Sequence, residues 1–140
     1  MEKFAIACDH GGYVLKEAIK VHFSDKIEFL DLGTNTTDSV DYPEFGQAVA
    51  KAVINGDAVR GIIICGTGIG ISIAANRFPG IRAALCTDTT MARLTRLHND
   101  ANVLALGARI TGEEVAFDIV NTFMNTDFEG GRHMSRIQKL

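Results

Sequence analysis

The chain has 140 residues, of which 46% are hydrophobic and 22% charged, and its formal net charge is −3. This length suits one domain with one core, and the composition is that of an ordinary globular protein. The acidic balance argues against a general nucleic-acid binder, which would carry a basic surface, and no apolar run approaches the length of a membrane span. Any anionic ligand must therefore be held by a local cluster of basic residues.

Short apolar runs alternate along the chain with segments of helical spacing. The runs predict strands over residues 4–8, 27–32, 62–65, 82–86 and 102–106. Helices are predicted over residues 13–23, 42–54, 72–76 and 89–98, followed by one with its apolar face from 115 to 123 and a partly helical basic tail over 128–140. Thr87 or Asp88 suits the N-cap of the fourth helix, and the segment 111–114 resembles a capping box.

Strands that alternate with helices imply βαβ units, and so a parallel sheet covered by helices on both faces. We expect a single domain over residues 1–140, without an internal repeat. In such sheets, ligands bind beyond the carboxyl ends of the strands, near a topological switch point. The first strand brings Asp9 and His10 to that edge, the third brings Cys65, and the fifth is followed by Arg109.

A glycine turn follows Cys65, with Gly66, Gly68 and Gly70 at alternate positions. Glycines free the backbone to turn sharply, and such a turn aims several N–H groups at one point, where they can hold an anion. A thiol at a helix N-terminus has its thiolate favoured, so Cys65 is a candidate base or nucleophile. The alternative is a buried, inert cysteine, which is the role expected for the other two, Cys8 and Cys86.

Two nucleotide-binding motifs are similar to this turn, but neither fits. The turn lacks the Lys-Ser/Thr pair of a P-loop, and Ile71 stands where G-x-G-x-x-G requires its third glycine. Asp88 could imitate the ribose-binding acid of a dinucleotide fold, but that fingerprint belongs after the first strand, where Asp9-His10-Gly11-Gly12 stands instead. Nicotinamide binding is therefore disfavoured, while loop geometry without a ligand stays open.

Asp9 can act as a general base or merely cap the next helix, and His10 can bind a phosphate oxygen or shuttle a proton. His98 is either functional or an exposed histidine at a helix end. Residues 132–136 are a basic cluster in which two arginines could grip a phosphate in forked geometry, although a solvated tail is the simpler interpretation. We expect this tail to reach a neighbouring subunit's site more easily than its own.

Aldose–ketose isomerisation of a sugar phosphate uses all of these parts. It needs a base, donors for the enediolate oxygen, an acid–base pair that opens the sugar ring and a cationic grip on the phosphate. It requires no cofactor and no metal, and the sequence shows no metal-ligand spacing. The odd number of cysteines, together with a start that leads directly into a strand without a secretion signal, indicates a cytoplasmic protein with reduced thiols.

Five long segments closely resemble ribose-5-phosphate isomerase type B, within a wider family that includes the galactose-6-phosphate isomerase subunits. The segments are Ala7-Cys8-Asp9-His10-Gly11-Gly12-Tyr13-x-Leu15-Lys16, Asp41-Tyr42-Pro43, Cys65-Gly66-Thr67-Gly68-Ile69-Gly70-Ile71-Ser72-Ile73-Ala74-Ala75-Asn76, His98-Asn99-Asp100-Ala101-Asn102-Val103-Leu104 and Phe128-Glu129-Gly130-Gly131-Arg132-His133-x-x-Arg136-Ile137. The resemblance implies interconversion of ribose 5-phosphate and ribulose 5-phosphate in the pentose phosphate pathway. It also implies a Rossmann-like three-layer α/β/α sandwich with five parallel strands, and a homodimer or dimer of dimers with shared active sites.

The resemblance also implies a role for each matched residue. Cys65 would move the proton between carbons 1 and 2 of the sugar. The enediolate would be held by the backbone of Gly66, Gly68, Ile69 and Gly70, with Thr67 and Asn99. Ring opening would fall to His98, with Asp9 and possible help from Thr67 and Tyr42. The phosphate would be held by His10, Arg109, Arg132, His133 and Arg136, some of them from across the dimer.

Two alternatives remain. One is an isomerase of a six-carbon phosphate, such as allose 6-phosphate or galactose 6-phosphate, which would use the same catalytic parts. The other is a phosphate-ligand binding module without catalysis, which would not require Cys65.

Overall fold

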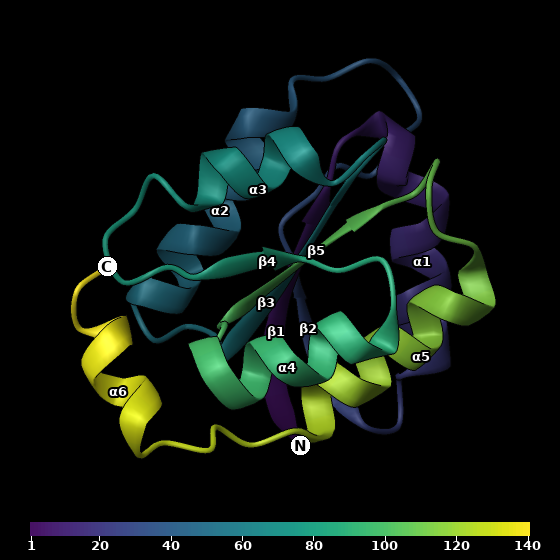
Figure 1. The fold of residues 1–140 in the computed structure, drawn as a ribbon. Helices are drawn as coiled ribbons and strands as arrows, with labels where there is room; N and C mark the ends of the chain where they lie inside the picture. The colour runs from purple at the N-terminus through teal and green to yellow at the C-terminus, as the bar shows by residue number, and fades with distance from the viewer.

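The computed structural model describes all residues from Met1 to Leu140. A five-stranded parallel sheet lies between two layers of helices, with strand order β2-β1-β3-β5-β4 (Figure 1). The strands are β1 (Glu2–Cys8), β2 (Ile27–Asp31), β3 (Arg60–Cys65), β4 (Ala83–Leu85) and β5 (Val103–Gly107). The helices are α1 (Tyr13–His22), α2 (Tyr42–Ile54), α3 (Ile69–Ala75), α4 (Thr89–Asn99), α5 (Glu113–Asn125) and α6 (Arg132–Ile137), with a 3₁₀ turn, η1 (His10–Gly12), after β1.

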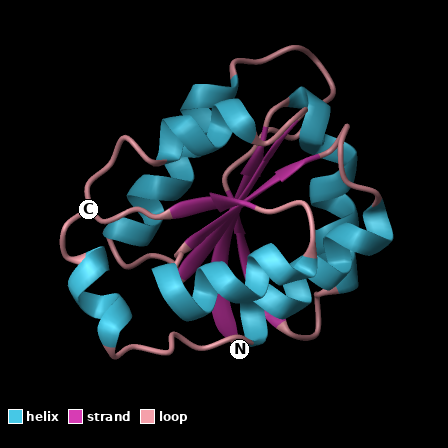
Figure 2. Cartoon of the chain, viewed as in Figure 1, coloured by secondary structure: helices cyan, strands magenta, loops and turns pink.

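The central strands bury both of their faces, which is why they read as continuous apolar runs. Phe4, Ile6 and Cys8 of β1 point into a core closed by α1, α4 and α5. The alternate residues Ala5 and Ala7 point into a second core, closed by α2 and α3. The predicted three-layer α/β/α sandwich is therefore confirmed, and Figure 2 shows the loops gathered at the two ends of the sheet.

The switch point lies between β1 and β3. These strands are neighbours, with Cys8 opposite Ile64, but β2 extends the sheet on one side while β5 and β4 extend it on the other. The connections that leave β1 and β3 therefore diverge at their carboxyl ends and leave a crevice between them. This crevice lies between Asp9 and the turn that follows Cys65, where the sequence predicts the site.

The helix ends confirm one capping prediction and correct another. Asp88 caps α4, because its Oδ1 accepts a hydrogen bond from Met91 N at 2.8 Å. The capping box predicted at Thr111 is wrong: α5 begins at Glu113, its N-cap is Gly112, and no side chain caps it. Thr111 instead lies buried, with its N–H bonded to Gly107 O at 2.9 Å, in the turn that leaves β5.

A buried lysine fastens the long loop between β2 and α2. Lys16 has a fully buried side chain, and its Nζ donates to Asp31 Oδ1 at 2.7 Å, to Thr34 O at 2.7 Å and to Asn35 Oδ1 at 3.2 Å. The backbone groups of Cys8 bond to the same loop, with Thr34 N donating to Cys8 O at 2.9 Å. None of the helices combines the length and apolar character needed to cross a membrane.

Candidate active site

The thiol of Cys65 lies at the carboxyl end of β3 and is only 5% exposed. Its Sγ accepts a hydrogen bond from Gly68 N at 3.1 Å, a contact that stabilises negative charge on sulfur. Gly68 takes a left-handed conformation, with φ of 79°, and a Cβ there would lie 2.5 Å from Leu85 Cδ1 and 2.8 Å from the backbone carbon of Leu106. Only glycine fits this position, so the turn and the contact to sulfur depend on it.

The end of β1 provides the facing wall. Asp9 Oδ1 accepts hydrogen bonds from Gly11 N at 2.9 Å and Gly12 N at 3.2 Å, so this carboxylate caps η1, as one of its two predicted roles requires. His10 Nδ1 accepts a hydrogen bond from Val40 N at 3.1 Å. An imidazole nitrogen that accepts carries no proton, so in the neutral ring the proton is on Nε2, which is left as a donor.

A hollow of about 240 Å³ lies between these two walls. Tyr42, the first residue of α2, closes one side, because a Cβ on Gly70 would lie 2.6 Å from its ring. Arg109 closes another side: its N–H donates to Gly66 O at 2.9 Å and its side chain lies along that glycine. The lining contains eight residues that the sequence predicts for the site, namely Asp9, His10, Tyr42, Cys65, Gly66, Thr67, Gly70 and Arg109, together with Gly11.

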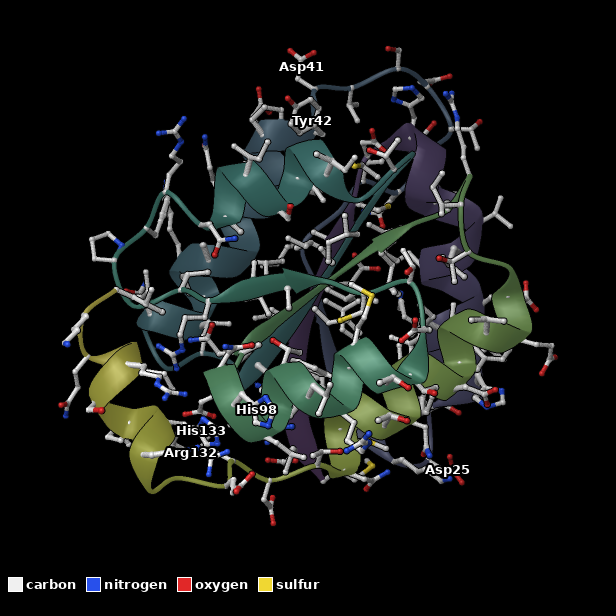
Figure 3. All side chains as sticks on the ribbon, in the orientation of Figure 1. Asp25, Asp41, Tyr42, His98, Arg132 and His133 are labelled. Carbon is white, nitrogen blue, oxygen red and sulfur yellow. The ribbon has the colours of Figure 1, made fainter.

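Of the other predicted residues, Gly68 and Ile69 belong to the glycine turn beside the hollow. His98 and Asn99, together with Arg132, His133 and Arg136 of the tail, lie at the opposite edge of the sheet. Helix α4 starts after the carboxyl end of β4 and runs back, so that His98 and Asn99 in its last turn reach the amino edge. Arg82, which precedes β4, donates from Nε to Asn99 O at 2.8 Å. Figure 3 shows Tyr42 at one end of the molecule and His98, Arg132 and His133 together at the other. Within one chain, His98 therefore does not join Asp9, and Asn99 does not join the glycine turn.

These distant residues form a second cluster of their own. The rings of His98 and His133 are stacked, with centroids 4.5 Å apart and planes inclined by 23°. Glu129 Oε2 lies 3.7 Å from His133 Nε2, and Arg132 and Arg136 are exposed beside them. Asn99 lines a larger hollow of about 810 Å³ between the segment 76–84 and the chain end.

His98, Glu129 and His133 bring three potential metal-ligand atoms within 4.8 Å of one another. Imidazole nitrogens bind a metal along lone pairs that lie in the ring plane. Because the two rings are stacked nearly face to face, their lone pairs do not converge on one point. This geometry suits packing between the rings better than a metal centre.

The other two cysteines are buried away from the hollow. Burial raises the pKa of Cys8 to about 11 and that of Cys86 to about 12, and the Cys8 thiol donates to Thr34 O at 3.8 Å. Both features agree with the structural role predicted for them. Two residues with no predicted role, Lys16 and Val40, help to fix the loop that leads to Tyr42. The position of Lys16, one turn after Gly12 and three residues before Ile19, was the available signal of its burial.

The family model described as Ribose/Galactose Isomerase matches residues 4–140. The chain belongs to this family. One relative, ribose-5-phosphate isomerase B of Escherichia coli K12, is 47% identical to this chain over 141 residues. The match covers 100% of this chain and 95% of that protein. The structure is also similar to that of Clostridium thermocellum ribose-5-phosphate isomerase B, with a TM-score of 0.97, 55% identity and coverage of 98% of this chain and 93% of the other.

A third member of the family has been solved with a sugar phosphate. The structure of ribose-5-phosphate isomerase B from Mycoplasma genitalium, with bound ribulose 5-phosphate, has a TM-score of 0.92 to this chain at 42% identity. The match covers 98% of this chain and 92% of the Mycoplasma genitalium chain. The resemblance predicted from the five sequence segments is therefore confirmed over the whole length of the isomerase fold.

Proposed function

We propose that this chain interconverts ribose 5-phosphate and ribulose 5-phosphate, with Cys65 as the proton-transfer base. The observation that carries the proposal is the thiol itself: it ends β3 at the switch point, receives the Gly68 N–H at 3.1 Å and faces the hollow of about 240 Å³. Relatives at 47% and 55% identity are named as ribose-5-phosphate isomerase B.

The reaction moves one proton between neighbouring carbons and one between the oxygens that they carry. The Cys65 thiolate takes the proton from carbon 2 of the aldose, and the electron pair of that C–H bond forms the double bond of an enediolate while the carbonyl oxygen on carbon 1 becomes negative. Return of the proton to carbon 1, with transfer of the hydroxyl proton on carbon 2 to the negative oxygen on carbon 1, gives the ketose. Backbone N–H groups of the glycine turn, with Thr67, stabilise the negative enediolate oxygen by donating hydrogen bonds to it.

The phosphate is held by a neutral hydrogen-bond donor and by cations. His10 offers Nε2–H, because its Nδ1 is occupied by Val40 N, and Arg109 supplies a fixed positive charge at the rim. The exposed arginines of α6, Arg132 and Arg136, supply the rest from a second copy of the chain. The ring-opening acid His98 and the oxygen ligand Asn99 come from that same copy.

The separation of the two clusters supports a homodimer with shared sites. One chain holds the base, the glycine turn and part of the phosphate site at the carboxyl edge of its sheet, and it holds His98 and the basic tail at the amino edge. A twofold axis that brings the carboxyl edge of each chain to the amino edge of its partner completes two identical sites. All three cysteines are free, which suits the reducing cytoplasm.

Substituting Cys65→Ala tests the base, and Cys8→Ala is the matched control, because it removes another buried thiol from the end of the neighbouring strand. We expect Cys65→Ala to lower kcat about 10²- to 10⁴-fold, as loss of a general base does. Binding of a phosphorylated open-chain acid, measured by calorimetry, should persist. Near-normal turnover of Cys65→Ala would refute the proposed base.

Two further measurements test the substrate and the shared site. Turnover of ribose 5-phosphate should exceed that of allose 6-phosphate and galactose 6-phosphate, and the reverse order would assign a six-carbon substrate. Inactive Cys65→Ala and Arg132→Ala proteins, once mixed and allowed to exchange subunits, should recover about a quarter of wild-type activity, since half of the dimers become mixed and each has one intact site. No recovery after demonstrated exchange would refute sharing.

A further inference from the structure

His133 is the one member of the basic tail that is buried. It lies in the first turn of α6 and is 4% exposed, whereas its neighbours Arg132 and Arg136 are exposed. Its Nε2 is sealed from solvent and has no hydrogen-bond partner. The resemblance implied a phosphate-binding role for all three residues, but they do not share one environment.

The contacts of His133 are to His98 and Glu129. The two imidazole rings stack with centroids 4.5 Å apart, and the Glu129 carboxylate lies 3.7 Å from Nε2, beyond hydrogen-bonding distance. The segment that carries these residues is fastened to α4, because Glu129 N donates to Leu97 O at 3.2 Å. His133 thus lies against His98 as part of the packing between the tail and α4, as Figure 3 shows.

The environment of His133 does not suit a phosphate ligand. An imidazole holds an anion best when it is protonated and exposed. Burial, together with the positive charges of His98 and Arg132, lowers the pKa of His133 and keeps the ring neutral near pH 7. A neutral ring with a sealed Nε2 contributes contact area and shape.

We propose that His133 is a positioning residue for His98 and is not a ligand of the substrate phosphate. Its ring limits the side-chain orientations of His98, so that the ring-opening acid enters the partner's site already oriented. This inference rests on the proposed isomerase function, because it assumes that His98 is the acid. Within the tail, only the exposed Arg132 and Arg136 then bind the phosphate.

Replacement of the ring separates the two roles. His133→Phe keeps a flat ring but has no nitrogen, and His133→Ala removes the ring, while Arg132→Ala provides the comparison for a lost phosphate ligand. For each dimeric protein, we would measure kcat and KM with ribose 5-phosphate and the affinity for 4-phosphoerythronate, an open-chain acid that carries the phosphate. The ring-proton resonances of His98 would report the stack directly, because a neighbouring aromatic ring shifts them.

We expect His133→Ala to lower kcat about 10- to 100-fold, as a misplaced catalytic group does, with affinity for 4-phosphoerythronate changed less than about twofold. His133→Phe should restore most of kcat, and Arg132→Ala should weaken the affinity. A loss of affinity for 4-phosphoerythronate in His133→Phe comparable to that in Arg132→Ala would overturn the inference. If His133→Ala does not fold, the result for His133→Phe decides alone. A His98 resonance that does not move in His133→Ala would also overturn it, whereas an inactive wild-type protein would overturn the proposed function instead.

Discussion

A single methyl group at Gly70 should separate activity from stability. Gly70 is the second residue of α3, and its φ is not in the left-handed region, so alanine suits its backbone. The new Cβ would lie 2.6 Å from Tyr42 Cε1 and 2.7 Å from its Cζ, closer than packed atoms come. Because Tyr42 is 41% exposed, its ring can swing outward, away from the hollow that it closes.

The two effects of Gly70→Ala have different sizes. Alanine in place of glycine inside a helix stabilises by roughly 0.5–1 kcal/mol, which offsets the cost of moving an exposed ring, so the free energy of unfolding should change by less than about 1 kcal/mol. Loss of the hydrogen bond that Tyr42 is expected to give the sugar during ring opening costs about 0.5–1.5 kcal/mol. At 1.36 kcal/mol for each factor of ten, kcat/KM should fall roughly 2- to 13-fold.

A double-mutant cycle with Tyr42→Ala is the assay, with kcat/KM for ribose 5-phosphate and urea unfolding measured for all four proteins. If the methyl group acts by displacing the ring, Gly70→Ala should cost nothing further once the ring is gone. An equal loss of kcat/KM in the Tyr42→Ala background would refute this reasoning. It would mean that the methyl group disturbs the N–H groups of the glycine turn itself.

The remaining predictions concern the buried lysine and the thiols. Asp31→Ala leaves the Lys16 ammonium buried without its carboxylate and should lower the free energy of unfolding by about 3 kcal/mol, more than Lys16→Met does. Equal losses of stability in the two variants, measured by urea unfolding, would contradict this. Burial opposes the ionisation of Asp31, but hydrogen bonds from Lys16 and Lys20 outweigh burial and lower the pKa of Asp31. The stability that the ionised Asp31 contributes is therefore present above about pH 4 and is lost as the pH falls through the lower pKa of the folded state. A pH dependence of unfolding that is unchanged in Asp31→Ala would contradict this. At pH 8 iodoacetamide should alkylate Cys65 alone. With pKa values of about 11 and 12, Cys8 and Cys86 have thiolate fractions of about 0.1% or less. Labelling of Cys8 or Cys86 comparable to that of Cys65, measured by mass spectrometry, would show that Cys65 is not the reactive thiol.

The order of strands and helices could be predicted because each central strand buries both faces. Phe4 and Ile6 enter one core and Ala5 and Ala7 the other, so no polar residue interrupts the run. The carboxyl-edge half of the site was predictable for the same reason. Once the strands are known to be parallel, the residues that follow them must meet at one edge.

The rest depended on where the helices end. Within one chain His98 cannot join Asp9, because the length of α4 carries it to the other edge of the sheet. A histidine in a basic tail is expected to be exposed, but the stack on His98 buries His133. Lysine in the middle of a helix is expected at the surface, and only the acceptors of a distant loop make the burial of Lys16 tolerable.

The division of the catalytic groups between the two edges of one sheet couples turnover to association. If each site takes its base from one chain and its acid from the next, a separated chain has no complete site, and specific activity should fall on dilution through the dimer dissociation constant. The same division determines how much activity remains when wild-type and defective chains are made together. A chain that carries defects at both edges, such as Cys65→Ala with Arg132→Ala, would damage both sites of every dimer it enters, so a cell that makes equal amounts of wild-type and doubly defective chains would keep about a quarter of its activity.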